Sequence, residues 1–352
     1  MATKRKDIAR AYITYREKRT EERNWNSSMM FTAKEKLTGA KIDNQNANID
    51  ERSFGGRRGE FDSVVLKQFA LDNCMSRMSK ENHLNNEIYI HDLDSYALGM
   101  HNCLTVPFDK LLAEGFNTRQ MDIRPAASIS SAFQLVAVVF QLQSLQQFGG
   151  VSASHIDWTM IPYVRKSFYK HFKDGMTYVQ GYNGHGANKE DAELSRYNDT
   201  MSIHDKMYKN YPYAFKYAID MTKRELVQAV EGMYHNLNTL QSRSGNQLPF
   251  TSINYGTCTL PEGRMVTKAI LEGSIKGGGK LHKTYIFPCG IFQCMKGINR
   301  KPGDPNYDLF KLALRSTAQR LYPNYANVDW SGNAGYDPKD PTTYFSTMGL
   351  VA

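Results

Sequence analysis

The chain has 352 residues, of which 41% are apolar and 12% aromatic, so it can bury the large core of a soluble globular protein. Its longest apolar stretch, 133–145, contains Gln134, Gln141 and Gln143 and is shorter than the roughly 20 apolar residues that a membrane span needs, so a membrane protein is not expected. The formal charge of +9 is dispersed along the chain, which favours a nucleoside triphosphate over a nucleic acid as the anionic partner.

The N-terminal part of the chain differs in composition from the rest. Residues 7–23 are charged and place Ile8, Ala11, Tyr12 and Tyr15 at steps of three and four residues, which predicts an amphipathic helix. Residues 24–58 are polar and rich in Asn, Ser and Gly, which predicts a linker or extended arm. The charged first residues lead into no apolar segment, so no secretory signal is expected and the cytoplasm is the expected compartment.

Beyond residue 58, helical and strand patterns alternate, as expected of an α/β protein. Short strands are predicted near Glu87, Asn102, Phe250 and Thr284. The longest predicted helix has an apolar face made by Leu226, Val230, Met233, Leu237 and Leu240, which indicates packing against another helix. The predicted helices are Val64–Met78, Ser128–Phe148, Trp158–Asp174, Tyr211–Arg243 and Tyr307–Leu321.

The cysteines and histidines form no recognisable metal or disulfide pattern. The five cysteines contain no CxxC pair and no even framework, which indicates reduced thiols rather than a disulfide scaffold or a four-thiolate zinc site. No HExxH pattern is present, so no metal site is expected in this chain. Cys289 and Cys294 lie in an apolar, strand-like run and are expected to be buried and inert.

The stretch 88–104 leads strand-like residues into Cys103. Residues 88–90 have the β-branched and aromatic side chains typical of a strand, and the polar run His91–Asp94 predicts a turn. These residues alone leave two interpretations open. Cys103 is either a small buried apolar residue, as free cysteines often are, or a thiol whose polar neighbours place it to react.

Several short motifs follow one another along the chain: Asn46–Glu51, Ser53–Arg57, Thr105–Asp109, Gln146–Gly150, Tyr163–Lys166, Ser244–Phe250 and Asp304–Asp308. With the 88–104 stretch, they resemble the anaerobic (class III) ribonucleoside-triphosphate reductases, which are glycyl-radical enzymes. Motifs in one order along most of a chain are a far more specific signal than any one of them. Formate-lyase-like glycyl-radical enzymes are a rival family, but the blocks Asn46–Asp50 and His91–Asp94 resemble the reductases.

The resemblance implies the first part of a ten-stranded α/β barrel of the ribonucleotide reductase type, incomplete at the finger loop, with helices for dimer packing. It divides the chain into residues 1–23, a C-terminal remnant of an ATP-cone domain, residues 24–58, a linker or arm, and residues 59–352, the N-terminal part of the catalytic barrel. The pattern of residues 9–17 fits an ordinary amphipathic helix as well as the last helix of an ATP-cone.

The resemblance also implies a role for Cys103. In the family, the matching cysteine lies on the first barrel strand below the substrate ribose and reduces the sugar radical after the 2′-hydroxyl has left as water. It further suggests substrate contacts at His101, Asn102, Ser244, Asn246 and Gln247, although Gly-Asn-Gln is also ordinary turn chemistry.

The family's thiyl cysteine follows a Met-Gly pair on the finger loop. Here Met348 and Gly349 are followed by Leu350, which has no S–H bond and cannot hold a thiyl radical. We therefore expect the chain to reduce ribonucleoside triphosphates only as part of a complete subunit, and to be inactive alone. The alternative is a non-catalytic fragment that binds nucleotide or dimerises.

No cofactor is expected to bind this chain itself. The family uses a glycyl radical, installed by a radical-SAM activase with a 4Fe-4S cluster and S-adenosylmethionine, a structural zinc in the C-terminal region, and often formate as reductant. The partners implied are a ribonucleoside triphosphate substrate, a deoxynucleotide or ATP effector, the activase, and a second copy of the chain in a homodimer.

Overall fold

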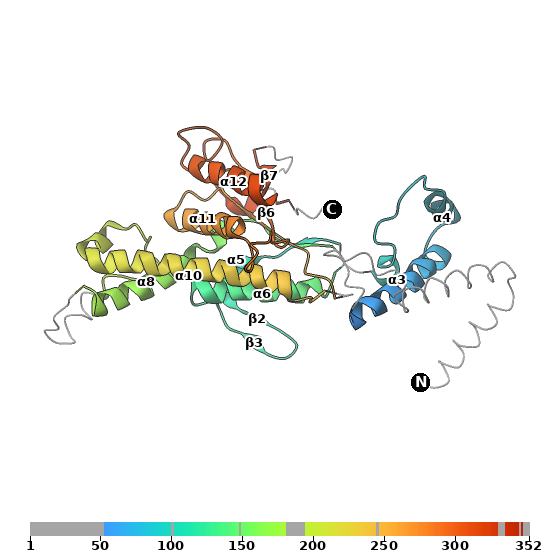
Figure 1. Cartoon of the computed structure of the whole chain (residues 1–352), viewed down its shortest axis with the longest axis horizontal. Coiled ribbons are helices and arrows are strands. Elements are labelled where there is room, and N and C mark those ends of the chain that lie inside the picture. Colours follow the sequence, from blue (N-terminus) through green and yellow to red (C-terminus); the bar gives the residue numbers. More distant parts are fainter. Residues whose placement is uncertain are drawn as a thin grey trace. The chain divides into compact units, whose positions relative to one another are not determined.

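The computed structural model describes residues 53–347 except 100–101, 148, 181–193, 244–245, 330–334 and 345. These residues form two compact units (Figure 1). The first unit contains residues 53–99 with 246–247, and the second contains the described residues of 102–243 and 248–347. The predictions for the ATP-cone remnant, for most of the arm and for residues 348–352 lie outside the described residues.

The first unit is built on two helices, α3 (Phe54–Asn73) and α4 (Arg77–Leu84). Each begins after a serine whose Oγ accepts a hydrogen bond from a backbone N–H of the first turn, Ser53 from Gly56 and Ser76 from Ser79. Residues 54–58 of the predicted arm are therefore helical. The predicted helix 64–78 is divided, because the cap at Ser76 starts a second helix.

The strand predicted near Glu87 is wrong. The N–H groups of Glu87 and Ile88 donate to Asn82 O, and Ile90 N donates to His83 Nδ1 at 3.2 Å. These local bonds use the donors that strand pairing would require. The unit instead ends in a short 3₁₀ helix, Tyr96–Leu98.

The second unit contains a parallel sheet of five strands in the order β1-β4-β5-β6-β7. Parallel strands joined by helices confirm the predicted α/β class. The strands predicted near Asn102 and Phe250 begin within two residues of those positions. The strand predicted near Thr284 begins five residues later, at Cys289. Strands β4 and β7 were not predicted. The strands are β1 (Leu104–Thr105), β4 (Val151–Ala153), β5 (Thr251–Tyr255), β6 (Cys289–Cys294) and β7 (Asn324–Asn327), with β2 (Phe116–Asn117) and β3 (Asp122–Ile123) forming a separate antiparallel pair.

The two faces of the five-stranded sheet differ in polarity. Thr105 is aligned with Ser152, and Ser152 with Ser252, so these three side chains share one face. Asn254 follows Ser252 by two residues and lies on the same side, which we call the polar face. The opposite face carries mainly apolar side chains and packs against helices. For example, the ring of Phe292 on β6 lies 6.0 Å from the ring of Phe310 in α12 (Tyr307–Arg320).

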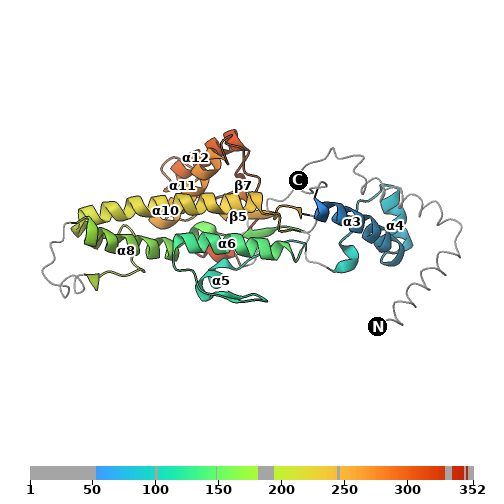
Figure 2. The same ribbon diagram turned by 60° about the horizontal axis from the view of Figure 1, so that its bottom comes forward.

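Two long helices, α6 (Ile129–Ser144) and α8 (Ile161–Tyr178), both lie alongside the longer helix α10 (Pro212–Thr239) (Figures 1 and 2). In the apolar stripe predicted on α10, Leu240 is 49% exposed, whereas its other four members are at most 1% exposed. Most of the stripe therefore belongs to the core of this chain.

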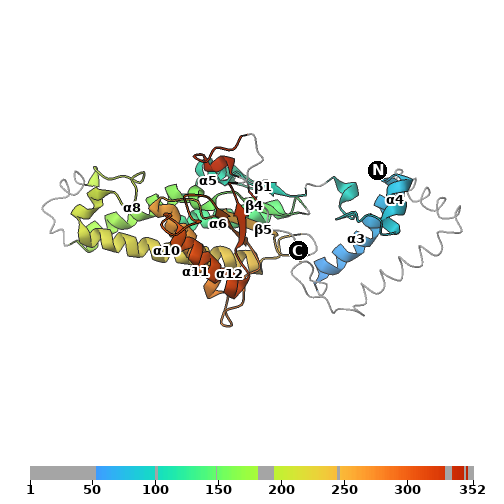
Figure 3. The same ribbon diagram turned by 90° about the horizontal axis from the view of Figure 1, so that it is seen from above.

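Figure 3 shows β1, β4 and β5 side by side. The remaining helices are α5 (Phe108–Glu114), α7 (Ile156–Thr159), α11 (Pro261–Lys276) and two 3₁₀ helices, Lys206–Asn210 and Pro341–Thr343.

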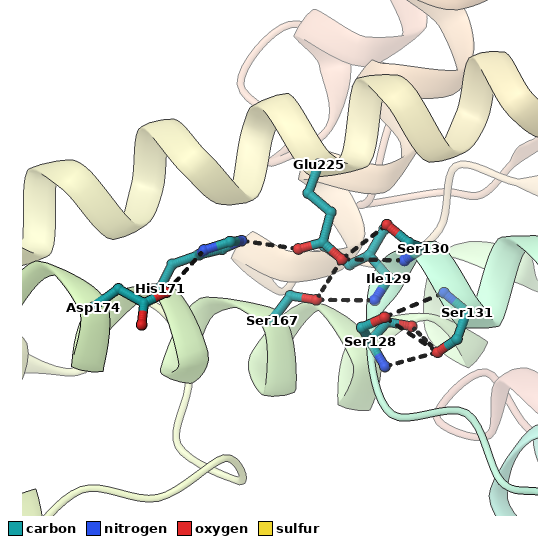
Figure 4. A network of polar contacts seen from close by, with 8 residues as sticks. All are labelled: Ser128, Ile129, Ser130, Ser131, Ser167, His171, Asp174 and Glu225. Atoms are coloured by element: carbon teal, nitrogen blue, oxygen red, sulfur yellow. Dashed lines mark hydrogen bonds and ion pairs between the residues drawn. The ribbon is translucent and has the colours of Figure 1, made fainter.

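A carboxylate joins the three long helices. Glu225 of α10 accepts hydrogen bonds from the backbone N–H and Oγ of Ser130 in α6 and pairs with Ser167 Oγ and His171 Nε2 of α8, at 2.9–3.2 Å (Figure 4). Burial alone would raise the pKa of Glu225, but the hydrogen bonds, that of His171 above all, outweigh it and lower the pKa to about 2. Glu225 is therefore ionised near neutral pH.

In the described part of the chain, no helix combines the length and hydropathy needed to cross a bilayer.

Candidate active site

Cys103 lies directly before β1, at the amino end of the parallel sheet. Its Sγ accepts a hydrogen bond from Gly150 N at 3.2 Å and donates to Asn102 Oδ1 at 3.3 Å. The residue is exposed, so it is not the small buried apolar residue of the first interpretation. Cys103 precedes Thr105 by two residues in extended chain and therefore belongs to the polar face of the sheet.

Gly149 allows the backbone of β1 to approach β4 at this point. A Cβ on residue 149 would lie 1.9 Å from Asn102 O, far inside van der Waals contact. The two chains therefore meet here only because residue 149 has no side chain. This close approach brings Gly150 N within reach of the sulfur.

We expect Gly149→Ala to lower the free energy of unfolding by about 1–3 kcal/mol, because the backbone must shift to relieve the clash. Urea unfolding measures the change. Gly232→Ala is the control, since a Cβ there meets nothing within 4 Å on helix α10 and should be neutral or stabilising. Equal stability of the Gly149 variant and the wild type would contradict the close approach.

The other cysteines of the second unit are less accessible than Cys103, although Cys289 is aligned with Ser252 and so lies on the same face of the sheet. Cys258 and Cys289 are buried, Cys294 is half-buried, and burial raises the pKa of all three thiols. A thiol that resists ionisation in an apolar setting is chemically quiet. This supports the prediction that Cys289 and Cys294 are inert. Cys74 is exposed, but it belongs to the first unit.

The polar face beside Cys103 carries small polar side chains that the sequence analysis missed. Ser152, Ser252 and Asn254 are each 0% exposed, although they lie on the face opposite the apolar, helix-packed one. The hydroxyl of Ser252 and Oδ1 of Asn254 have no hydrogen-bond partner among the described residues. Two polar residues at a two-residue spacing inside an apolar strand, Ser252 and Asn254, were the available sequence signal.

The structure brings together only part of the predicted site. Asn102 is in contact with Cys103, as described above. His101 and Ser244 lie outside the described residues. Asn246 and Gln247 belong to the first unit, where the side chain of Asn246 lies against Gly55. The roles of all five residues as substrate contacts stay predictions.

A second polar cluster lies at the carboxyl end of β4, at the opposite end of the strand from Cys103. His155 is placed between Ser154 Oγ at 2.7 Å and Asp109 Oδ2 at 2.6 Å, and Thr159 Oγ1 donates to the second oxygen of Asp109. Burial alone would raise the pKa of Asp109, but the hydrogen bonds from His155 and Thr159 outweigh it and lower the pKa. This cluster joins α5 to the loop after β4.

The described residues contain no group of three or more His, Cys, Asp or Glu side chains that could hold a metal ion.

The sequence and the fold were compared with known proteins. The family model described as anaerobic ribonucleoside-triphosphate reductase matches residues 45–349. The enzyme of that name from Haemophilus influenzae is 31% identical over 333 residues, which cover 94% of this chain and 42% of the relative. The one from Enterobacteria phage T4 is 32% identical over 288 residues, covering 82% and 42%. The chain thus spans about two fifths of the length of these relatives.

The fold agrees with these matches. The anaerobic ribonucleotide reductase from Thermotoga maritima, solved in complex with dATP and CTP, superposes with a TM-score of 0.52 at 12% identity, covering 80% of this chain and 44% of that one. At such low identity the likeness concerns the fold, and it confirms an α/β architecture of the barrel type for the parallel sheet described above. The family match over residues 45–349 shows that this chain belongs to the anaerobic ribonucleoside-triphosphate reductase family.

Proposed function

We propose that the chain forms the first part of the catalytic barrel in a subunit that reduces ribonucleoside triphosphates to deoxyribonucleoside triphosphates by radical chemistry, with Cys103 as the reducing thiol. One observation carries the proposal. Cys103 is an exposed thiol at the start of the first strand, on the face of the sheet that carries Ser152, Ser252 and Asn254.

The surroundings of Cys103 suit a thiol that gives up a hydrogen atom. Asn102 Oδ1 accepts a hydrogen bond from the thiol and so orients its S–H group, while Gly150 N donates a hydrogen bond to the sulfur. When the 2′-hydroxyl leaves as water, the remaining sugar radical needs one electron and one proton. Cys103 would supply both as a hydrogen atom and would become a thiyl radical. We propose formate as the class of reductant. It would return a hydrogen atom to the sulfur, and the carbon dioxide radical anion that remains would pass its second electron to the sugar, which carries a 3′-ketone after the loss of water, and leave as carbon dioxide.

We propose the remaining partners from family membership. They are a ribonucleoside triphosphate substrate, a deoxynucleotide or ATP effector, a radical-SAM activase that installs a glycyl radical in the complete subunit, and a second copy in a homodimer. The cytoplasm is the proposed compartment. His101, Asn102, Ser244, Asn246 and Gln247 remain proposed substrate contacts.

The proposal predicts that a ribonucleoside triphosphate shields Cys103. We expect saturating CTP to slow the alkylation of Cys103 by iodoacetamide by about tenfold, because a nucleotide on the polar face would cover the thiol. Peptide mapping by mass spectrometry follows each cysteine separately. Cys74 is the internal control, since it is exposed in the first unit and should react at the same rate with and without CTP.

Two results would contradict the proposed site. One is a rate of Cys103 alkylation that does not change when CTP is added. The other is equal slowing at Cys74 and Cys103, which would show a general effect of the nucleotide on the reagent. A chain that binds CTP and protects Cys103 without turnover would fit the alternative of a non-catalytic binding fragment, and activity of the complete subunit then separates the two.

A further inference from the structure

Asn254 of β5 makes an unusual set of contacts on the polar face. Its side chain is 0% exposed, and Nδ2 lies 3.0 Å from Ala153 O and 3.2 Å from Ser152 Oγ, both on the neighbouring strand β4. The same nitrogen lies 3.1 Å from Thr347 O and 3.2 Å from Ser346 Oγ, in the segment 346–347. One buried amide therefore contacts both the sheet and a segment more than ninety residues later.

The two N–H bonds of the amide can be assigned. Ala153 O and Thr347 O are carbonyl oxygens that can only accept, whereas Ser152 and Ser346 carry hydroxyls that can also donate. The best assignment gives one N–H to each carbonyl, so the amide bridges β4 and segment 346–347. The position needs a donor, since the Oδ1 atom of Asn254 has no partner among the described residues.

The location of this bridge connects it to Cys103. Asn254 projects from the polar face, so the segment that its tip contacts lies on that side of the sheet. Cys103 belongs to the same face, on β1, and β4 alone separates β1 from β5. Neighbouring strands are about 4.8 Å apart, so β1 and β5 are about 10 Å apart, which is within the length of a nucleotide.

We propose that Asn254 is a positioning residue that holds segment 346–347 at a fixed height above the polar face and so sets the space in which a nucleotide meets Cys103. The mechanical part of this proposal is independent of any ligand. Its meaning for catalysis rests on the proposed function of Cys103. Because the bridge consists of donor hydrogen bonds from a buried amide, removing the donor frees the segment from the sheet.

A nitroxide on residue 347 tests the bridge directly. Thr347 contributes only its backbone carbonyl, so Thr347→Cys carries the label without removing the contact, in a chain in which Cys74, Cys103 and Cys294 are replaced by serine. We expect an immobilised electron paramagnetic resonance spectrum with Asn254 present. Asn254→Ala should lose the immobilised component, because its methyl side chain has no hydrogen to donate.

Asn306→Ala is the matched control. Asn306 is also a 0% exposed asparagine whose Nδ2 donates to two carbonyls, Gly256 O and Cys258 O, and none of its side-chain hydrogen bonds reaches segment 346–347. This variant should keep the immobilised component. If Asn254→Ala fails to fold by circular dichroism, Asn254→Leu replaces it, since a leucine is of similar size, has no hydrogen to donate and should lose the same component.

The second readout is the protection of Cys103 by CTP in chains that keep all native cysteines. The CTP concentration for half-protection should rise about tenfold in Asn254→Ala and stay unchanged in Asn306→Ala. An immobilised label in Asn254→Ala, or equal loss in Asn306→Ala, overturns the bridge. A freed label with unchanged CTP protection overturns its role at the site, whereas absence of protection in the wild type would instead count against the proposed function.

Discussion

Cys103→Ser is expected to abolish deoxynucleotide formation by the complete subunit that contains this chain, with a loss in kcat on the order of 1,000-fold or more. A serine hydroxyl fits the same space and keeps the hydrogen bond from Gly150 N, but its O–H bond is too strong to give a hydrogen atom to a carbon radical. The measurement is conversion of radiolabelled CTP to its deoxynucleotide after anaerobic activation. Binding of CTP should change by no more than about threefold, since the shape of the site is kept.

Cys294→Ser is the matched control for this loss. Cys294 also belongs to the second unit, at the end of β6, but it is half-buried and burial raises the pKa of its thiol. Its replacement should leave kcat within about twofold of the wild type. Normal turnover by Cys103→Ser would remove this sulfur from the mechanism, and an equal loss in both variants would point to a structural cause.

Glu225→Gln is expected to lower the free energy of unfolding of the chain by about 2–4 kcal/mol, because the carboxylate joins α6, α8 and α10 through four hydrogen bonds. The neutral amide accepts the bonds from Ser130 and Ser167 more weakly, and its NH2 group takes the place of the carboxylate oxygen that pairs with His171 Nε2. Urea unfolding near neutral pH measures the difference. Glu231→Gln on the same helix is the control, since Glu231 pairs with Lys276 at the surface and should contribute less than about 1 kcal/mol.

The same residue predicts a dependence on pH. The pKa of Glu225 is lowered from its ordinary 4.5 to about 2, so its contribution is fully present above pH 4.5 and is lost as the pH falls toward 2. A shift of this size corresponds to about 3 kcal/mol. The stability difference between wild type and Glu225→Gln should therefore shrink between pH 5 and pH 2.5. A difference that stays constant over this range would show that Glu225 is not ionised through these contacts.

The long helices were predictable from sequence because their signal is local. The helix predicted at Ser128–Phe148 appears as Ile129–Ser144, with Ser128 as its cap, and the helix predicted at Tyr211–Arg243 appears as Pro212–Thr239. A period of 3.6 residues over many turns is robust to errors at the ends. Two helices, α5 and α11, were missed.

Strands were harder to predict for the opposite reason. β1 has two residues and β4 has three, too few for an alternating pattern to be visible. Conversely, residues 87–90 have strand-forming side chains, yet their donors are used by His83 and Asn82. Whether a short segment joins a sheet depends on partners distant in the sequence, which a local pattern does not contain.

The family, the α/β class and the choice of Cys103 could be read from ordered motifs and residue types, which are properties of the chain alone. The folded structure was needed to show that Cys103 is exposed, that Gly149 lets β1 approach β4, and that Asn254 contacts both β4 and segment 346–347. Exposure, close backbone approach and hydrogen bonds between residues about a hundred positions apart depend on packing, and no local sequence pattern encodes which distant segments will pack together.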